Sequence, residues 1–228
     1  LNTNTNGILG GWATVNTGDG TTAAANLEFA TYDAVTGIRQ INNVEQTGTF
    51  SASVATSNLR IAANATITNG GQTINSLTIH GATTVSFTGT TLDTLTLASG
   101  GLLDGSDAQN RVIGATTNAN TRGRITSSAS EFFIHNGANT LTIHSAITGT
   151  TNPVFTSAGT AGGATIRLTN ANTYVGSTFS NGVILLLDNQ TGGGAAITGD
   201  LTLTGGNISG TETGSVANST VRNLGAHQ

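Results

Sequence analysis

Short runs in which apolar and polar residues alternate recur along most of the chain. Examples are Leu77-Thr78-Ile79-His80, Val85-Ser86-Phe87-Thr88 and Leu95-Thr96-Leu97-Ala98. An alternation of period two places apolar side chains on one face of a strand and polar side chains on the other. Corners with glycine, such as Gly70-Gly71 and Gly100-Gly101, separate the runs and allow a positive φ. The pattern predicts many short β-strands and no long helix.

The runs also recur at a regular interval. The gaps between successive apolar strand positions alternate between eight and ten, so that every second position repeats after eighteen; the positions are Leu59, Ile67, Leu77, Val85, Leu95, Leu103 and Ile113. A fixed interval with short strands is typical of stacked repeats, each of which buries its inner face on its neighbours. We predict an all-β fold, a parallel β-helix (β-solenoid) with about 18–20 residues per turn. About a dozen turns would give a rod of roughly 55 Å.

An antiparallel β-sandwich is the alternative fold. Asn181-Gly182 is a hairpin signal in such a fold, and short strands at this close spacing fit it as well. The alternation of a shorter and a longer gap as a repeating unit favours the solenoid, because the strands of a sandwich have no reason to repeat in this way.

Residues 1–45 differ from the rest of the chain in their aromatic content. Trp12, Phe29 and Tyr32 are three of the ten aromatic residues of the chain and form a candidate interface with a partner or another copy. We therefore predict an N-terminal segment, 1–45, that acts as a cap or an interface. Residues 46–228 are expected to form the solenoid, with a polar loop near 114–130 where the alternation weakens.

Two stretches carry a resemblance to a known family. The first is Leu168-Thr169-Asn170-Ala171-Asn172-Thr173-Tyr174 with Asn181-Gly182 before a leucine-rich strand, and the second is Gly10-Gly11-Trp12-Ala13-Thr14. They resemble the autotransporter-associated β-strand repeat of long exported bacterial surface proteins. The chain departs from the usual repeat at two corners: Gly176-Ser177 stands in place of paired glycines after the tyrosine, and Val183-Ile184 stands where a glycine or threonine is expected after Asn181-Gly182. The resemblance implies a right-handed β-helix and an extracellular or cell-surface location.

Composition narrows the function classes. Charged residues make up 8% of the chain and its net charge is −4, without a basic cluster, so nucleic-acid binding is not expected. No apolar run reaches about 18 residues, and no transmembrane segment is expected. The absence of cysteine rules out disulfides and thiol catalysis. Because no signal peptide is visible and the chain begins at Leu1, we interpret it as a mature or excised piece of a larger exported protein.

Few residues are candidates for chemistry. A polysaccharide-degrading β-helix enzyme would need clustered carboxylates or a calcium site with an arginine, and Asp104, Asp107 and Arg111 are the closest such group. Their spacing in a glycine-containing corner is more typical of a turn. We predict no catalytic, cofactor-binding or metal site and no cofactor.

Histidines and asparagines occupy regular positions in the pattern. His80, His135 and His144 follow strand runs and are expected to point outward as single exposed side chains. Asparagines at corners can bond from one repeat to the next and form a structural ladder. The candidate ladder residues are Asn64, Asn69, Asn170, Asn172 and Asn181.

These features favour a non-catalytic structural protein, a stiff rod of the bacterial surface or extracellular matrix. The sequence shows no obvious cap at either end, so open strand edges could stack head-to-tail into a fibre. The expected partners are thus further copies or neighbouring repeats of a longer chain. An adhesin segment that binds glycans or cell surfaces through Thr/Asn-rich faces is the alternative, and a polysaccharide-degrading enzyme the third hypothesis.

Overall fold

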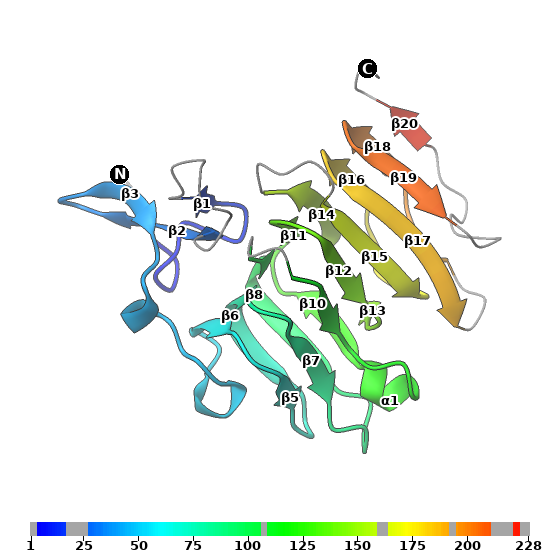
Figure 1. Cartoon of the computed structure of the whole chain (residues 1–228), viewed down its shortest axis with the longest axis horizontal. Coiled ribbons are helices and arrows are strands. Elements are labelled where there is room, and N and C mark those ends of the chain that lie inside the picture. The colour runs from blue at the N-terminus through cyan, green and yellow to red at the C-terminus, as the bar shows by residue number, and fades with distance from the viewer. Residues whose placement is uncertain are drawn as a thin grey trace.

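The fold is built almost entirely from β-strands. The computed structural model describes residues 4–16, 27–105, 109–158, 164–191, 195–210 and 221–223 (Figure 1). Helical structure within them is limited to α1 (Ala119–Arg122) and the 3-10 turns η1 (Asn43–Glu45) and η2 (Phe50–Ala52). The prediction of an all-β fold is confirmed.

The described strands form three sheets. The N-terminal sheet is antiparallel and contains β1 (Thr14–Asn16), β2 (Leu27–Asp33) and β3 (Gly37–Gln40). The ten-stranded sheet contains β4 (Asn58–Ile61), β6 (Gln72–Ile79), β8 (Thr94–Asp104), β10 (Arg124–Ser127), β11 (Glu131–Asn136), β13 (Ala146–Ile147), β14 (Asn152–Ser157), β16 (Thr178–Asn181), β18 (Leu201–Thr204) and β20 (Val221–Asn223). The seven-stranded sheet contains β5 (Ala65–Ile67), β7 (Thr84–Phe87), β9 (Arg111–Ile113), β12 (Thr140–Ile143), β15 (Thr165–Asn170), β17 (Ile184–Thr191) and β19 (Asn207–Gly210).

Strand direction decides between the two predicted folds. Among the described strands, every pair within the two large sheets is parallel, and the N-terminal sheet alone is antiparallel. The antiparallel β-sandwich is therefore wrong. The chain instead passes repeatedly between the two large sheets, and each strand pairs with a strand of the neighbouring pass (Figure 1).

The interval between paired strands is not constant. Leu59 pairs with Leu77, one predicted interval later, but Leu77 pairs with Leu102 and Leu102 with Ile134. Leu95, which the predicted interval aligns with Leu77, pairs with Gln72 instead. The prediction of a constant interval is thus wrong, because later passes contain additional strands and longer connections.

Fewer passes also make a shorter stack than predicted. Eight consecutive strands of the ten-stranded sheet, from β4 through β6, β8, β11, β14, β16 and β18 to β20, follow one another in the described part of the chain. At ~4.8 Å per strand they span about 34 Å, rather than roughly 55 Å.

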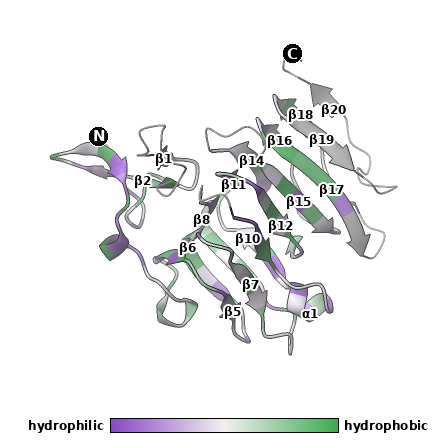
Figure 2. Cartoon of the chain, in the orientation of Figure 1, coloured by the Kyte–Doolittle hydropathy of each residue, from purple (hydrophilic) through white to green (hydrophobic). Residues whose placement is uncertain are grey.

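The interior between the sheets is apolar and fully buried. Alternate residues of each strand contribute to it, as in β12, where Leu141 and Ile143 are buried and Thr142 between them is partly exposed. Phe155 and Tyr174 fill it further along the stack. In Figure 2, the first half of β17, with the sequence Ile-Leu-Leu-Leu, is hydrophobic. The alternation in the sequence therefore marks the inward-facing residues of such strands correctly.

The predicted polar loop near 114–130 is wrong in its second half. Arg124–Ser127 form β10, which pairs with β8 on one side and β13 on the other. Ile125 is buried in the interior between Leu95 and Ile147. Ile125 is the one apolar residue of this strand. A single apolar residue among polar ones does not form a recognisable alternation, so the strand could not be predicted from the sequence.

Candidate interaction surfaces

The N-terminal sheet packs against the outer face of the ten-stranded sheet, beside β8 and β11 (Figure 1). Its apolar contact is small. Among the described residues it consists of one buried cluster, made of Ile8, Leu27, Phe29, Ile41 and the outward-facing Leu103 of β8. The described part of residues 4–45 therefore covers a side of the stack and not its end.

Two glycines permit this close packing. A Cβ atom on Gly101 would lie 2.7 Å from the Cα of Gly11 and 2.8 Å from the ring of Phe29. A Cβ atom on Gly11 would lie 2.4 Å from the backbone nitrogen of Gly101. Since real Cβ atoms do not approach other atoms so closely, neither position accepts a side chain without displacing the N-terminal segment.

A buried carboxylate joins the N-terminal segment to the large sheet. Glu28 Oε1 accepts hydrogen bonds from Arg60 Nε at 2.7 Å and from His80 Nε2 at 2.8 Å. Gln46 Nε2 donates to Glu28 Oε2 at 3.1 Å. Burial opposes ionisation of Glu28, but these hydrogen bonds outweigh it, so the pKa of Glu28 is lowered. The carboxylate is held in its charged form at neutral pH.

A buried histidine makes the second polar contact. His135 Nε2 donates to the carbonyl of Gly11 at 2.8 Å, and Nδ1 accepts from the Thr156 hydroxyl at 2.5 Å. The ring of Phe29 meets the imidazole edge-on at 6.3 Å. Burial lowers the pKa of His135 to about 4, so the neutral imidazole is the stable form in this contact.

The histidines were predicted to be exposed, which is wrong for two of them. His80 and His135 do occupy outward-facing positions, but the N-terminal segment covers both. His144 is half-buried, and its Nδ1 lies 2.6 Å from Thr169 Oγ1. Burial, with Arg167 and Arg122 nearby, lowers the pKa of His144. The alternation predicts on which side of a strand a side chain lies. It does not predict which distant segment covers the outer face of the sheet.

The three aromatic interface candidates do not form one surface. Phe29 is 1% exposed and belongs to the internal contact, so it cannot meet a partner in this conformation. Trp12 is 61% exposed and Tyr32 partly so. Of the three predicted aromatic residues, only Trp12 and Tyr32 are accessible to an external partner.

The predicted asparagine ladder exists as amide-to-neighbour bonds and not as stacked asparagines. Asn172 joins three passes, because its Oδ1 accepts from Ile147 N at 2.8 Å and its Nδ2 donates to the Ala196 carbonyl. Asn170 Nδ2 donates to the carbonyl of His144 at 3.0 Å. The Asn-x-Asn of the repeat-like stretch thus satisfies backbone groups of adjacent passes.

The other ladder candidates divide into two cases. Asn64 Oδ1 accepts from the backbone nitrogen of Thr84 at 2.9 Å, and Asn69 Oδ1 accepts from the hydroxyls of Thr88 and Thr90. Asn181 ends β16 with an exposed side chain. The first two link neighbouring passes at the surface.

A chain of hydrogen-bonded amides, two of which are buried, was missed. Asn58 Oδ1 accepts from Asn75 Nδ2 at 2.7 Å, and Asn75 Oδ1 accepts from Asn6 Nδ2 at 3.1 Å. Asn58 Nδ2 in turn donates to the Asn6 carbonyl at 2.7 Å. These amides belong to strands and to the N-terminal segment, not to glycine corners, and the corner criterion therefore overlooked them.

Asp104 and Arg111 form a fully buried, hydrogen-bonded pair in the stack. Arg111 Nη1 donates to Asp104 Oδ1 and to the carbonyls of Gly105 and Gln109. Burial raises the pKa of Asp104 to about 8 in spite of the guanidinium beside it. The prediction of a surface turn is wrong for these two residues, whereas Asp107 lies outside the described residues.

Residues 47–53 cover the end of the stack next to β4. Thr47 pairs with Leu59 through two hydrogen bonds of 2.8 Å, from Thr47 N to the Asn58 carbonyl and from Arg60 N to the Thr47 carbonyl. Phe50 of η2 is 6% exposed and closes the apolar interior. The expectation of an uncapped N-terminal end is therefore wrong for the ten-stranded sheet, whereas β5 remains the outermost described strand of the seven-stranded sheet.

Comparisons with known proteins do not assign this chain to a family. The chain matches no protein-family model, no curated protein and no solved structure. In the described part of the chain, no three His, Asp or Glu side chains lie together in a way that could hold a metal ion. The helices described there include none long and apolar enough to cross a membrane.

Proposed function

We propose that this chain is a stiff, non-catalytic structural segment of an exported bacterial surface protein, folded as a parallel β-helix. The observation that carries the proposal is the parallel pairing of strands from successive passes around one continuous apolar interior. In such an arrangement each pass is held by its neighbours, which gives length and stiffness from a simple repeated unit. The expected winding is right-handed.

Two further observations support a structural role. Asparagine side chains bond backbone groups of adjacent passes, which resists separation along the stack. The stretch Leu168–Tyr174 resembles the autotransporter-associated β-strand repeat, and its tyrosine is buried in the interior. The extracellular location rests on that resemblance.

The end cap argues for a rod over a head-to-tail fibre. Residues 47–53 occupy the N-terminal end of the interior, where a second copy would have to stack. An adhesive role of the outer faces remains the alternative, since outward positions such as Thr84 and Thr142 carry polar hydroxyls.

Negative-stain electron microscopy over a hundredfold concentration range tests this proposal. We expect separate small particles without filaments at every concentration, and no cleavage of polygalacturonate or alginate by the same preparation. Fibres would favour self-assembly over a capped segment, and cleavage would contradict the non-catalytic role.

A further inference from the structure

One strand position is unfilled at the capped end of the seven-stranded sheet. On the ten-stranded sheet, Thr47 pairs beyond β4 and so adds one more strand position. The chain then crosses the interior through η2 and does not form a strand beyond β5. β5 is consequently the outermost described strand of its sheet.

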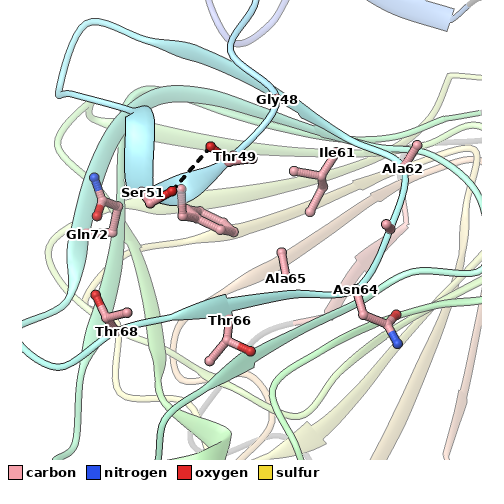
Figure 3. Close-up of a pocket in the computed structure, with 12 residues that line it drawn as sticks. Gly48, Thr49, Ser51, Ile61, Ala62, Asn64, Ala65, Thr66, Thr68 and Gln72 are labelled. Atoms are coloured by element: carbon pink, nitrogen blue, oxygen red, sulfur yellow. Dashed lines mark hydrogen bonds between the residues drawn. The ribbon is translucent and has the colours of Figure 1, made fainter.

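A hollow of about 450 Å³ occupies this position (Figure 3). It lies between η2 on one side and β5 with the preceding corner on the other, and Ile61 and Ala65 point toward it. Small side chains dominate the corner, where Ala62 and Ala63 precede Asn64. The described residues that line the hollow include no charged side chain.

The backbone of β5 offers hydrogen-bonding groups to this hollow. The carbonyl of Ile67 accepts from Thr88 N at 3.1 Å and therefore faces β7. Since successive residues of a strand direct their N–H and C=O groups to opposite edges, those of Thr66 face away from β7. An outer edge of this kind is a template for an added strand.

We propose that the hollow binds an extended, uncharged peptide segment of a partner protein, which adds to β5 as a further parallel strand. Backbone bonds to Thr66 would supply affinity, and apolar side chains of alternate residues would enter the space between Phe50 and Ala65. A charged residue at those inward positions would be buried without a counter-charge and so be rejected. This inference does not depend on the proposed structural role.

The end of a second copy fits this position poorly. At the opposite end, β20 extends the ten-stranded sheet beyond β18, whereas β19 is the outermost described strand of the seven-stranded sheet. The seven-stranded sheet is thus recessed at both described ends. If the ten-stranded sheets of two copies met, none of the described strands of the second copy would fill the position beyond β5. A separate extended segment can enter the hollow without this mismatch.

The test uses a blocked, fluorescently labelled peptide with the sequence of residues 83–88, Thr-Thr-Val-Ser-Phe-Thr, which includes the strand that already pairs with β5. We expect saturable binding to the full chain in fluorescence anisotropy. Hydrogen exchange of the Thr66 amide should slow at least tenfold at saturation. The same peptide with charged residues in place of its valine and phenylalanine is the ligand control.

Thr66→Pro removes the N–H that faces the hollow, and proline is tolerated on the open side of an edge strand. We expect this variant to bind the peptide at least tenfold more weakly, while Thr66→Val binds as the wild type does. Unchanged binding by Thr66→Pro, no saturable binding, or no slowing of Thr66 exchange would overturn the proposal. The exchange measurement on the wild type decides the question even if Thr66→Pro does not fold.

Discussion

The interior of the stack and the contact made by the described part of residues 4–45 are held by different interactions. Phe155 and its neighbours in the interior form a single apolar cluster that runs from Phe50 to Leu201. The N-terminal contact has a small apolar cluster and depends in addition on the polar bonds of Glu28 and His135. We infer that the N-terminal segment can detach while the stack stays folded, and that pH acts on the two regions in opposite directions.

Truncation in the interior should have the largest effect. Phe155 is fully buried between passes, and Phe155→Ala removes its ring from the apolar cluster. We expect a loss of about 3–5 kcal/mol in the free energy of unfolding, measured by denaturant titration with circular dichroism. Thr142→Ala, at a partly exposed position of β12, is the control and should change stability by less than about 0.5 kcal/mol.

Acid should weaken the N-terminal contact. The pKa of His135 is lowered to about 4 by burial, so the detached segment leaves an imidazole that binds a proton more readily. The contact is therefore fully stable above about pH 6.5 and loses stability as the pH falls toward 4, by about 3 kcal/mol in total. Glu28, whose pKa is lowered by its hydrogen bonds, acts in the same direction at still lower pH.

Trp12 reports this change, because it is the only tryptophan and follows the glycine whose carbonyl bonds His135. We expect a fluorescence transition between pH 6.5 and 4 that His135→Gln removes. His144→Gln is the matched control, since His144 also bonds a threonine hydroxyl but does not touch the N-terminal segment. A transition that follows His144 and not His135 would contradict this assignment.

The stack should respond to pH in the opposite sense. Burial raises the pKa of Asp104 to about 8, above its unfolded value of 3.8. Its contribution to stability is thus fully present below pH 3.8 and is lost as the pH rises through 8. Chemical denaturation followed by circular dichroism should show a stack that gains stability as the pH is lowered from 8 toward 4.

A single methyl group should detach the N-terminal segment at neutral pH. In Gly101→Ala the new Cβ meets the backbone of Gly11 and the ring of Phe29. We expect the contact to weaken by about 2 kcal/mol, seen as faster hydrogen exchange in residues 27–33 with little change in β12. Gly48→Ala, where the Cβ meets no atom within 4 Å, should leave both regions unchanged.

The amide bonds between passes should give the smallest of these effects. Asn172→Ala leaves the buried amide of Ile147 and the carbonyl of Ala196 without their partner, at a cost of about 1–2 kcal/mol. Asn181→Ala, at an exposed strand end, should be within about 0.5 kcal/mol of the wild type in the same thermal unfolding experiment.

Much of the local structure could be predicted from the sequence. Period-two alternation identifies the buried residues of strands such as β7 and β12, because each strand has one apolar face. Register could not be predicted in the same way. The regular spacing aligned Leu77 with Leu95, but β8 bends through Gly100 and pairs with β6 over two separate stretches, which shifts the partner to Leu102.

The interaction surfaces were predicted less well. Alternation places His80 and His135 on the outer side of a strand but contains no information about which distant segment covers them. Asp104 and Arg111 were assigned to a surface corner by residue type, and their mutual pairing allows both to be buried. Long-range contacts decided each of these cases.

The parallel register of the passes is the central claim, and a pair of engineered cysteines tests it most directly because the chain has none of its own. Val112 and Thr142 are partners in adjacent strands of the seven-stranded sheet and both face outward. Val112→Cys with Thr142→Cys should form a disulfide on mild oxidation. Val112→Cys with Ser130→Cys, the pair that the constant interval predicted from the sequence would align, should stay reduced. Efficient cross-linking of the second pair and not the first would contradict the stacking described.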